Sequence, residues 1–326
     1  MAICKQAHPI VTFPPPTTIT SDPFNGWRRK DKVVVVMGAT GTGKSRLSID
    51  LATRFPAEII NSDKMQVYQG LDITTNKVTK EEKRGIPHHL LGVIDPEDDF
   101  TATDFRLQAS MAVDSIVKKD CLPIIVGGSN SYIESLIDDE NLEFRSKYDC
   151  CFLWVDVSLP VLNSFVSDRV DRMVEYGLLD EVERIFKTDG DYAYGIRRAI
   201  GVPELDLYFR YGASSDEETR SELLRNAIDD IKRNNCVLAQ NQLKKINRLR
   251  RLPGWNINRI NATDVLLSHG RNANDKWEHH VARPSTMIVS KFLFDNDYYT
   301  GTTITTSGSA ISAVMGTPIA AAAAAR

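Results

Sequence analysis

Residues 38–45, with the sequence GATGTGKS, constrain the fold of this 326-residue chain more than any other stretch. They fit the pattern G-x-x-x-x-G-K-[ST], in which glycines allow backbone angles that turn successive N–H groups toward one anion. A β-branched run precedes this loop, and residues 44–54 after it place Leu47 and Leu51 on one helix face. The sequence therefore predicts a buried strand, a phosphate-binding loop and a helix whose N-terminus faces the phosphates. The loop consists of Gly38, Ala39, Thr40, Gly41, Thr42, Gly43, Lys44 and Ser45.

Two side chains of this loop add to the chemistry of its backbone. Lys44 is a compact cation that can reach phosphate oxygens, and the Ser45 hydroxyl can hold Mg²⁺, the one cofactor we expect. An NTPase usually adds an aspartate at the end of a later strand to support that ion. Here the most apolar strand ends in Gly127-Gly128, and Asp156 lies within another predicted strand. The pattern therefore disfavours an ordinary ATPase.

Composition narrows the class of protein. Hydrophobic residues make up 42% of the chain and charged residues 25%, which is typical of a soluble globular protein. The net charge of -3 provides no global basic field, so we expect no long nucleic acid as a partner. No apolar run approaches ~18 residues, so we predict no membrane span. We also expect the protein to be a monomer. The five cysteines lack metal-site spacing and favour free thiols in a reducing compartment.

Strand and helix patterns alternate along the first half of the chain. Beyond the loop, buried strands are predicted at 57–60, 122–126 and 151–157, with a helix over 103–118. This alternation predicts an α/β fold, a P-loop NTPase-like parallel sheet flanked by helices and joined by right-handed crossovers. A smaller, mainly helical domain is predicted next, with helices over 161–187 and 222–251.

These patterns divide the chain into five parts. We expect the P-loop core over 32–158, a helical substrate-binding region over 159–251, and a segment packing back on the core over 252–300. Residues 1–31 are poor in acids and rich in hydroxyls, which fits either a transit peptide or a disordered extension. The predicted location is accordingly the plastid or the cytoplasm. Residues 301–326 are of low complexity and are predicted to be a disordered tail.

The predicted helix over 222–251 carries two polar residues, Asn235 and Gln242, on an otherwise apolar inner face that includes Leu238. One interpretation is a polar contact between packed helices, and the other is that this face lines a polar site. Residues 221–251 also hold eight basic and three acidic side chains, a difference of +5. Such a run is either a solvated helix face or a surface that attracts phosphate or RNA.

Asp63 is the acid best placed for chemistry. It follows the predicted strand 57–60, which we expect beside the P-loop strand, at the sheet edge where ligands bind in such folds. A carboxylate there can accept a hydrogen bond from an amine or hydroxyl that is about to attack. The alternative is that Asp63 only caps a helix or a turn.

The sequence around Asp63 resembles that of isopentenyltransferases. The run 61–68 (NSDKMQVY) is similar to the family's motif after its second strand. Further landmarks follow in the family's order, at 87–90 (PHHL), 100–105 (FTATDF), 127–132 (GGSNSY), 169–173 (RVDRM) and 199–205 (AIGVPEL). The similarity covers roughly residues 33–251. Its details most resemble plant adenylate isopentenyltransferases, as in DKM at 63–65 and DCCFLWVD at 149–156.

The resemblance implies a function. Such enzymes transfer a dimethylallyl group from dimethylallyl diphosphate to N6 of the adenine of ATP or ADP, with AMP less favoured, as the first step of cytokinin biosynthesis. By this resemblance Asp63 aligns the amine and takes its proton, while Thr40 and Lys44 contact the departing diphosphate, whose charge needs preorganised donors. Weaker candidates for substrate contacts are Arg169, Arg172, Lys232 and Gln242.

Three other functions stay open. A tRNA isopentenyltransferase would perform the same chemistry on RNA, with a broad basic surface and base-stacking aromatics. A small-molecule kinase could use the same loop and the same aspartate, whereas a nucleotide-binding regulatory protein would need no carboxylate there. Where the family usually has Arg-Gln, this chain has Asn241-Gln242, which removes one expected phosphate contact. His88 and His89 lack a third metal ligand nearby, and Tyr132 is more typical of a core aromatic than of a prenyl contact.

Overall fold

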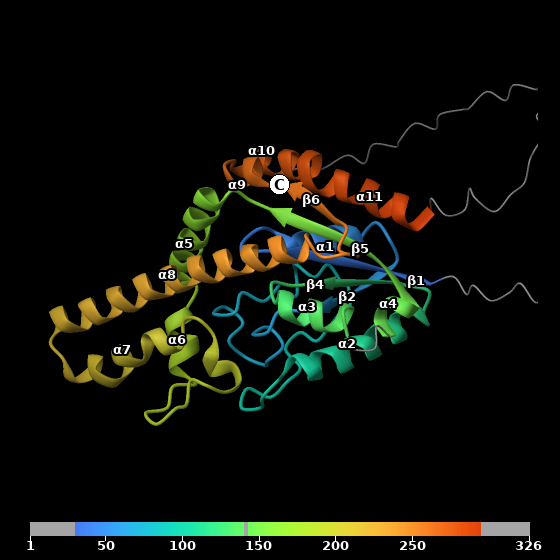
Figure 1. Ribbon diagram of the computed structural model, residues 1–326. Coiled ribbons are helices and arrows are strands. Elements are labelled where there is room, and N and C mark those ends of the chain that lie inside the picture. The colour runs from blue at the N-terminus through green and yellow to red at the C-terminus, as the bar shows by residue number, and fades with distance from the viewer. Residues whose placement is uncertain (1–29, 140–142, 295–326) are drawn as a thin grey trace, which may run out of the picture.

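The computed structural model describes residues 30–139 and 143–294, and its centre is one sheet of six parallel strands (Figure 1). The strands lie in the order β3-β2-β4-β1-β5-β6. Nearly all of the predicted N-terminal extension and the whole predicted C-terminal tail fall outside the described residues. The strands are β1 (Asp31–Gly38), β2 (Ala57–Asn61), β3 (His88–His89), β4 (Leu122–Val126), β5 (Tyr148–Asp156) and β6 (Ile257–Asn261).

The P-loop strand β1 lies at the centre of the sheet because both of its faces are apolar. Its run Val33–Val36 is fully buried, and Val34 is in register with Ile124 of β4 and Cys151 of β5. A parallel strand without a polar face must be covered by helices on both sides. The strands predicted at 57–60, 122–126 and 151–157 are confirmed as β2, β4 and β5.

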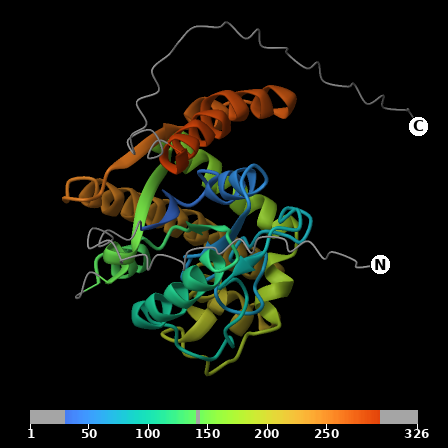
Figure 2. The same cartoon turned by 90° about the vertical axis from the view of Figure 1, so that its right-hand side faces the viewer.

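Helices cover both faces of the sheet (Figures 1 and 2). The helices α2 (Ala102–Val117), α3 (Asn130–Ile137) and α4 (Glu143–Lys147) cover one face, where Val35, Phe105 and Ile133 belong to one apolar cluster. On the opposite face, Val34 clusters with side chains from the P-loop helix and from the C-terminal helices. These elements are α1 (Lys44–Ala52), α9 (Thr263–Leu266), α10 (Gly270–Trp277), the π-helical turn η4 (Glu278–Ala282) and α11 (Arg283–Phe294).

A helical lobe extends from the carboxyl edge of the sheet (Figure 1). It contains α5 (Leu159–Glu175), α6 (Leu178–Glu183), η1 (Gly195–Arg198), η2 (Pro203–Leu205), α7 (Asp206–Tyr211), η3 (Gly212–Ser214) and the 33-residue helix α8 (Glu217–Leu249). The long helix α8 packs along α5 and returns the chain to the sheet. The lobe therefore lies over the carboxyl edge of the sheet, at which the P-loop opens.

Two predictions about this lobe were wrong in detail. The single helix predicted over 161–187 is interrupted at Gly177, whose φ of 101° is a left-handed conformation that ends α5 and starts α6. The helix predicted from residue 222 begins at Glu217 instead. Asp216 caps it, because its side chain accepts a hydrogen bond of 2.8 Å from the Thr219 N–H.

The expected neighbourhood of β1 and β2 was also wrong, because β4 lies between them. Sequential strands are neighbours in only about two-thirds of connections. Here the chain skips one position after α1, and β4 later fills it. The consequence is that Gly127 and Gly128, which follow β4, stand between the P-loop and Asp63.

Within 30–139 and 143–294, no helix has both the length and the apolar character to cross a bilayer.

Candidate active site

The P-loop is held in shape by its own glycines and by the C-terminal helices. Gly41 and Gly43 adopt φ values of 83° and 92°, which L side chains rarely tolerate. A Cβ atom on Gly43 would also lie 2.7 Å from the Trp277 ring, so this position has no room for a side chain. Within the loop, Thr42 Oγ1 donates a hydrogen bond of 2.9 Å to the Ala39 carbonyl. The loop is therefore held in shape by contacts within the protein itself.

Lys44 lies buried inside this loop, near the charges of both Asp63 and Arg169. Its Nζ donates a hydrogen bond of 2.6 Å to the Ala39 carbonyl. Burial lowers the pKa of Lys44 from 10.5 to about 8, Asp63 opposes this shift, and the nearby positive charge of Arg169 adds to it. An anionic ligand would relieve both the desolvation and the repulsion of this ammonium group.

Asp63 reaches the P-loop across the end of β4, because Gly127 and Gly128 lack side chains there. A Cβ atom on Gly127 would lie 2.4 Å from the Ser62 backbone, and one on Gly128 would lie 3.7 Å from Asp63 Oδ2. Asp63 Oδ1 accepts hydrogen bonds from the backbone N–H groups of Met65 at 3.0 Å and Gln66 at 3.4 Å. Among the described residues none donates a hydrogen bond to Oδ2, so one oxygen shapes a turn and the other is available for a ligand.

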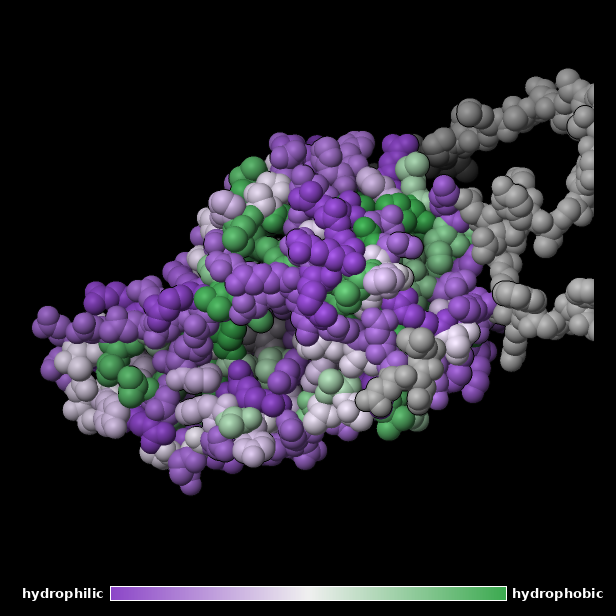
Figure 3. Space-filling view, viewed as in Figure 1, coloured by the Kyte–Doolittle hydropathy of each residue, from purple (hydrophilic) through white to green (hydrophobic). Residues whose placement is uncertain are grey.

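Two chambers meet at Asp63. The P-loop chamber has a volume of about 380 Å³ and is lined by most of the loop residues 40–45 and by several apolar side chains. The α8 chamber, of about 320 Å³, lies beside α8 and is lined largely by polar side chains. In the view of Figure 3 the surface is hollowed alongside α8. The residues that line both chambers are Thr40, Asp63, Gln66, Asn76 and Arg169.

Arg169 is the cation at this junction. Its Nη2 donates hydrogen bonds to Thr40 Oγ1 at 3.1 Å and to Asn235 Oδ1 at 3.2 Å. Its Nε is buried without a hydrogen-bond partner. Burial lowers the pKa of Arg169 to about 10, with Asp63 opposing the shift and Arg172 adding to it. A buried donor without a partner beside a phosphate-binding loop is suited to an anionic ligand.

The polar face of α8 lines this site. Gln242 Oε1 accepts a hydrogen bond of 2.7 Å from the Thr40 N–H, and Asn235 holds Arg169. Both residues are buried and line the α8 chamber. The interpretation of this face as part of a polar site is therefore the one that the geometry supports. One predicted inner position differs, since Leu238 is 37% exposed and Ala239 is buried in its place.

The remaining candidates lie in different surroundings. Ser45 and Arg172 line the P-loop chamber, the latter with its guanidinium 5.5 Å from the Phe165 ring centroid. Lys232 lines neither chamber, and its Nζ lies 2.6 Å from a carboxylate oxygen of Asp171. The structure therefore brings Ser45 and Arg172 to the site and leaves Lys232 outside it.

Other residues singled out in the sequence have structural partners. Asp156 ends β5, where Arg259 Nε donates to its Oδ2 at 2.7 Å. His89 lies 2.7 Å from Glu58, and the ring of Tyr132 stacks on Phe105 at 5.0 Å between centroids. In the described part of the chain, no three His, Cys, Asp or Glu side chains gather as a metal site. A Mg²⁺ ion at Ser45 would thus take most of its ligands from phosphate oxygens and water, which suits that ion.

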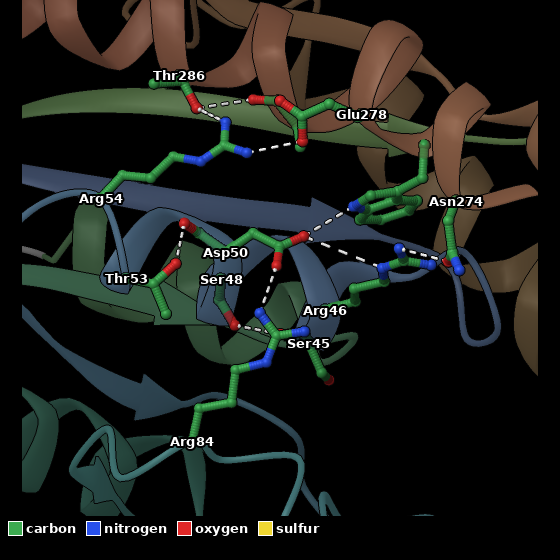
Figure 4. Close-up of polar contacts among 12 residues, drawn as sticks. Ser45, Arg46, Ser48, Asp50, Thr53, Arg54, Arg84, Asn274, Glu278 and Thr286 are labelled. Atoms are coloured by element: carbon green, nitrogen blue, oxygen red, sulfur yellow. Dashed lines mark hydrogen bonds and ion pairs between the residues drawn. The ribbon is translucent and has the colours of Figure 1, made fainter. Parts of the chain in front are cut away.

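A polar network behind the P-loop was not predicted (Figure 4). Asp50 on α1 accepts hydrogen bonds from Trp277 Nε1 at 2.7 Å and from Arg84 at 3.1 Å. Arg46 lies over the Trp277 ring, 4.5 Å from its centroid, and donates to Asn274 at 3.0 Å. No local pattern in the sequence marks Trp277, because its partners are more than 200 residues away.

Comparisons with known proteins agree with this geometry. The sequence model described as IPP transferase matches residues 66–146 and 138–248. The chain is 61% identical to "Adenylate isopentenyltransferase 5, chloroplastic" of Arabidopsis thaliana, with 83% of each chain covered. It is 54% identical to "Adenylate isopentenyltransferase 3, chloroplastic" of the same plant, with 90% of each covered. It is 45% identical to "Adenylate isopentenyltransferase" of Humulus lupulus, with 79% of this chain and 89% of the relative covered.

Solved structures of the same fold include enzymes that are described as acting on tRNA. A eukaryotic dimethylallyltransferase acting on tRNA has a TM-score of 0.68 and 24% identity, covering 82% of this chain and 80% of its own. A tRNA isopentenylpyrophosphate transferase from Bacillus halodurans has a TM-score of 0.63 and 26% identity, covering 82% of this chain and all of its own. At 24% identity the first likeness concerns the fold alone.

Proposed function

This chain belongs to the IPP transferase family, and we propose that it transfers a dimethylallyl group from dimethylallyl diphosphate to N6 of the adenine of ATP or ADP, with AMP less favoured. It is therefore a prenyltransferase, an adenylate dimethylallyltransferase that performs the first step of cytokinin biosynthesis. Relatives whose names say chloroplastic support a plastid location. The observation that carries the proposal is Asp63, a carboxylate placed where a phosphate-binding chamber meets a second, polar chamber.

The two chambers differ in the residues that line them, and this difference supports an assignment of the two substrates. The P-loop chamber combines the phosphate-binding loop with the apolar residues Ile59, Val78 and Leu91, which suits a diphosphate carrying a short apolar chain. The α8 chamber combines Asn235 and Gln242 with Ser129 and Gln66, which suits the hydrogen-bonding edges of a base. We therefore assign the prenyl donor to the P-loop chamber and the nucleotide to the α8 chamber.

The reaction forms one bond and breaks another at the same carbon. The N6 lone pair attacks C1 of the dimethylallyl group while the C1–O bond to diphosphate breaks. An exocyclic adenine amine is a poor nucleophile, so Asp63 Oδ2 accepts an N6–H, aligns the lone pair and takes the proton as N6 becomes positive. Asp63 Oδ1 stays bound to the turn, which fixes the direction of the carboxylate.

The departing diphosphate gains negative charge, and the site supplies donors for it before the reaction starts. These donors are the P-loop N–H groups, the Lys44 ammonium and the Arg169 Nε, which is buried without a partner. Thr40 lies between them, with its side chain held by Arg169 and its backbone held by Gln242. A Mg²⁺ ion held by Ser45 would neutralise charge on the same diphosphate.

A tRNA dimethylallyltransferase is the second candidate, because solved structures of this fold act on tRNA by their descriptions. The test is to incubate the purified protein with dimethylallyl diphosphate and AMP, ADP, ATP or unmodified tRNA, and to detect prenylated product by mass. We expect product with ADP and ATP, and less with AMP. Product on tRNA alone would overturn the proposal, and phosphate transfer without prenylation would make the protein a kinase.

A further inference from the structure

A groove beside the P-loop chamber is lined by cations that the transfer step does not use. This basic groove has a volume of about 850 Å³, and the basic residues that line it are Arg46, Lys77, Lys80, Lys83 and Arg84. Six residues line both the groove and the P-loop chamber, and they are Ser45, Arg46, Asn76, Val78, Met173 and Tyr176. The groove therefore adjoins the P-loop chamber beside the first turn of α1.

Three of the five cations are already held by the protein. Lys77 Nζ lies 2.8 Å from a carboxylate oxygen of Asp72, and Arg84 Nη1 lies 3.1 Å from one of Asp50 (Figure 4). Arg46 is held against the C-terminal helices by the contacts described above. These three side chains therefore shape the groove and have little freedom to follow a ligand.

Lys80 and Lys83 are the two cations of the groove that have such freedom. Among the residues that the structure describes, no ion pair or hydrogen bond holds either side chain. Lys80 is exposed and Lys83 is partly exposed. Burial lowers the pKa of His88, which lines the P-loop chamber, and the positive charge of Lys83 adds to this shift. The charge of the groove therefore acts inside the chamber to which we assign the diphosphate.

We propose that the basic groove guides the diphosphate end of the prenyl donor into the P-loop chamber and receives the inorganic diphosphate that leaves it, with Lys80 and Lys83 as the guiding cations. This inference rests on the proposed function and adds to it a surface for diphosphate outside the reaction site. A cleft lined by one sign of charge raises the local concentration of an oppositely charged ligand and its association rate. A lysine ammonium is a hydrated point charge on a flexible stem, so it attracts an anion without fixing its orientation.

The nucleotide acceptor does not need this route. Among the described residues, Asn76 is the one that lines both the groove and the α8 chamber, and none of the five cations of the groove lines that chamber. Lys80 and Lys83 should therefore act on the donor and on diphosphate. A separate groove supplies matched control positions, because Lys244 and Arg251 line it, are exposed and line neither chamber.

The test compares the double variant Lys80→Gln/Lys83→Gln with the double variant Lys244→Gln/Arg251→Gln in the full-length protein. Glutamine removes the charge and keeps a polar side chain at positions that reach solvent. Rapid filtration measures the association rates of radiolabelled dimethylallyl diphosphate and of radiolabelled inorganic diphosphate, with no nucleotide present. At about 0.01 M salt the groove variant should bind both ligands about threefold to tenfold more slowly, and the control variant within about twofold of the unmodified protein.

Raising the salt concentration separates guidance from a change of shape. The Debye length falls from about 30 Å at 0.01 M to about 10 Å at 0.1 M, so the deficit of the groove variant should shrink over that range. Three results would overturn the inference. They are unchanged association rates in the groove variant, an equal loss in the control variant, and a loss of the same size at both salt concentrations.

Because these rates are measured without turnover, the inference and the proposed function can fail separately. If both ligands follow the expected pattern but no nucleotide is prenylated, the proposed function fails and the guiding groove stands. If nucleotides are prenylated while the association rates of the groove variant are unchanged, the proposed function stands and the guiding groove is overturned.

Discussion

At the scale of single residues, the site depends on a few charges that the protein holds out of water. Lys44 and Arg169 lie near Asp63, and burial lowers the pKa of both cations. The desolvation that weakens their charge in the free protein also strengthens their attraction for a diphosphate. The negative charge of Asp63 opposes both shifts, and in the proposed reaction its second oxygen accepts the amine. In the proposed reaction the carboxylate therefore connects donor binding with acceptor activation.

The pKa of Lys44, about 8, predicts how donor binding depends on pH. Below that pH the lysine is protonated in the free protein, and above it the proton must be taken up when the diphosphate binds. The Kd of dimethylallyl diphosphate should therefore rise as pH increases through about 8, by up to about tenfold per pH unit. Calorimetry in buffers of different ionisation enthalpy should detect this proton uptake. A Kd that stays constant between pH 7 and 9.5 would contradict the assignment, and Lys44→Met should show no uptake.

At the scale of elements, α8 connects the helical lobe to the P-loop. Gln242 accepts the Thr40 N–H, and Asn235, seven residues earlier on the same face, accepts from Arg169. Two helix positions thus fix two residues of the phosphate site. Gln242 also leaves no room for a side chain at position 128, because a Cβ atom on Gly128 would lie 2.4 Å from Gln242 Nε2. The helix therefore orders the P-loop and leaves the connection between the chambers open.

Substituting Gln242 tests this connection. Gln242→Ala leaves the Thr40 N–H without its acceptor, which should lower the free energy of unfolding by about 1–3 kcal/mol. It should also raise the KM of both substrates, that of the donor because Thr40 belongs to the P-loop and that of the nucleotide because Gln242 lines the α8 chamber. The control is Asn241→Ala on the adjoining, exposed position of α8, where we expect little change. Equal effects of the two substitutions, measured by denaturant unfolding and steady-state kinetics, would contradict the role of Gln242.

The sequence predicts those parts of the site that depend on contiguous residues. The P-loop, the strands and the position of Asp63 after a strand follow from local patterns, and the family landmarks point to the chemistry. The insertion of β4 between β1 and β2 does not follow from local patterns, because strand order depends on packing between distant segments. The exposure of Leu238 in place of Ala239 has the same origin, since a small rotation of α8 exchanges neighbouring positions.

At the scale of the whole molecule, the C-terminal segment supports the phosphate site from behind. The strand β6 pairs with β5, and Trp277 then packs against Gly43 and donates to Asp50 on α1. Trp277 is 3% exposed, so its side chain belongs to the core on that face of the sheet. The first and last parts of the fold therefore meet behind the P-loop, and neither forms this support alone.

Substitutions of Trp277 separate packing from hydrogen bonding. Trp277→Ala removes a buried aromatic side chain and should lower the free energy of unfolding by about 3–5 kcal/mol. It should also raise the KM of the donor, because Gly43 loses the ring that backs it. Trp277→Phe keeps a ring in the core but loses the hydrogen bond to Asp50 and the indole atoms nearest Gly43, so its cost should be smaller, about 1–3 kcal/mol. Denaturant unfolding checks both values. Similar losses in the two variants would contradict the packing role.

The central claim is that Asp63 is the base for prenyl transfer to an adenine amine, and Asp63→Asn tests it most directly. Asparagine keeps an oxygen for the Met65 and Gln66 N–H groups, so the turn should persist, but its amide cannot take the proton. We predict that the single-turnover rate with ADP falls by about 10²–10⁴-fold. The donor should bind at least as tightly as before, because a negative charge near Lys44 and Arg169 is removed. A near-normal rate in this variant would contradict the account.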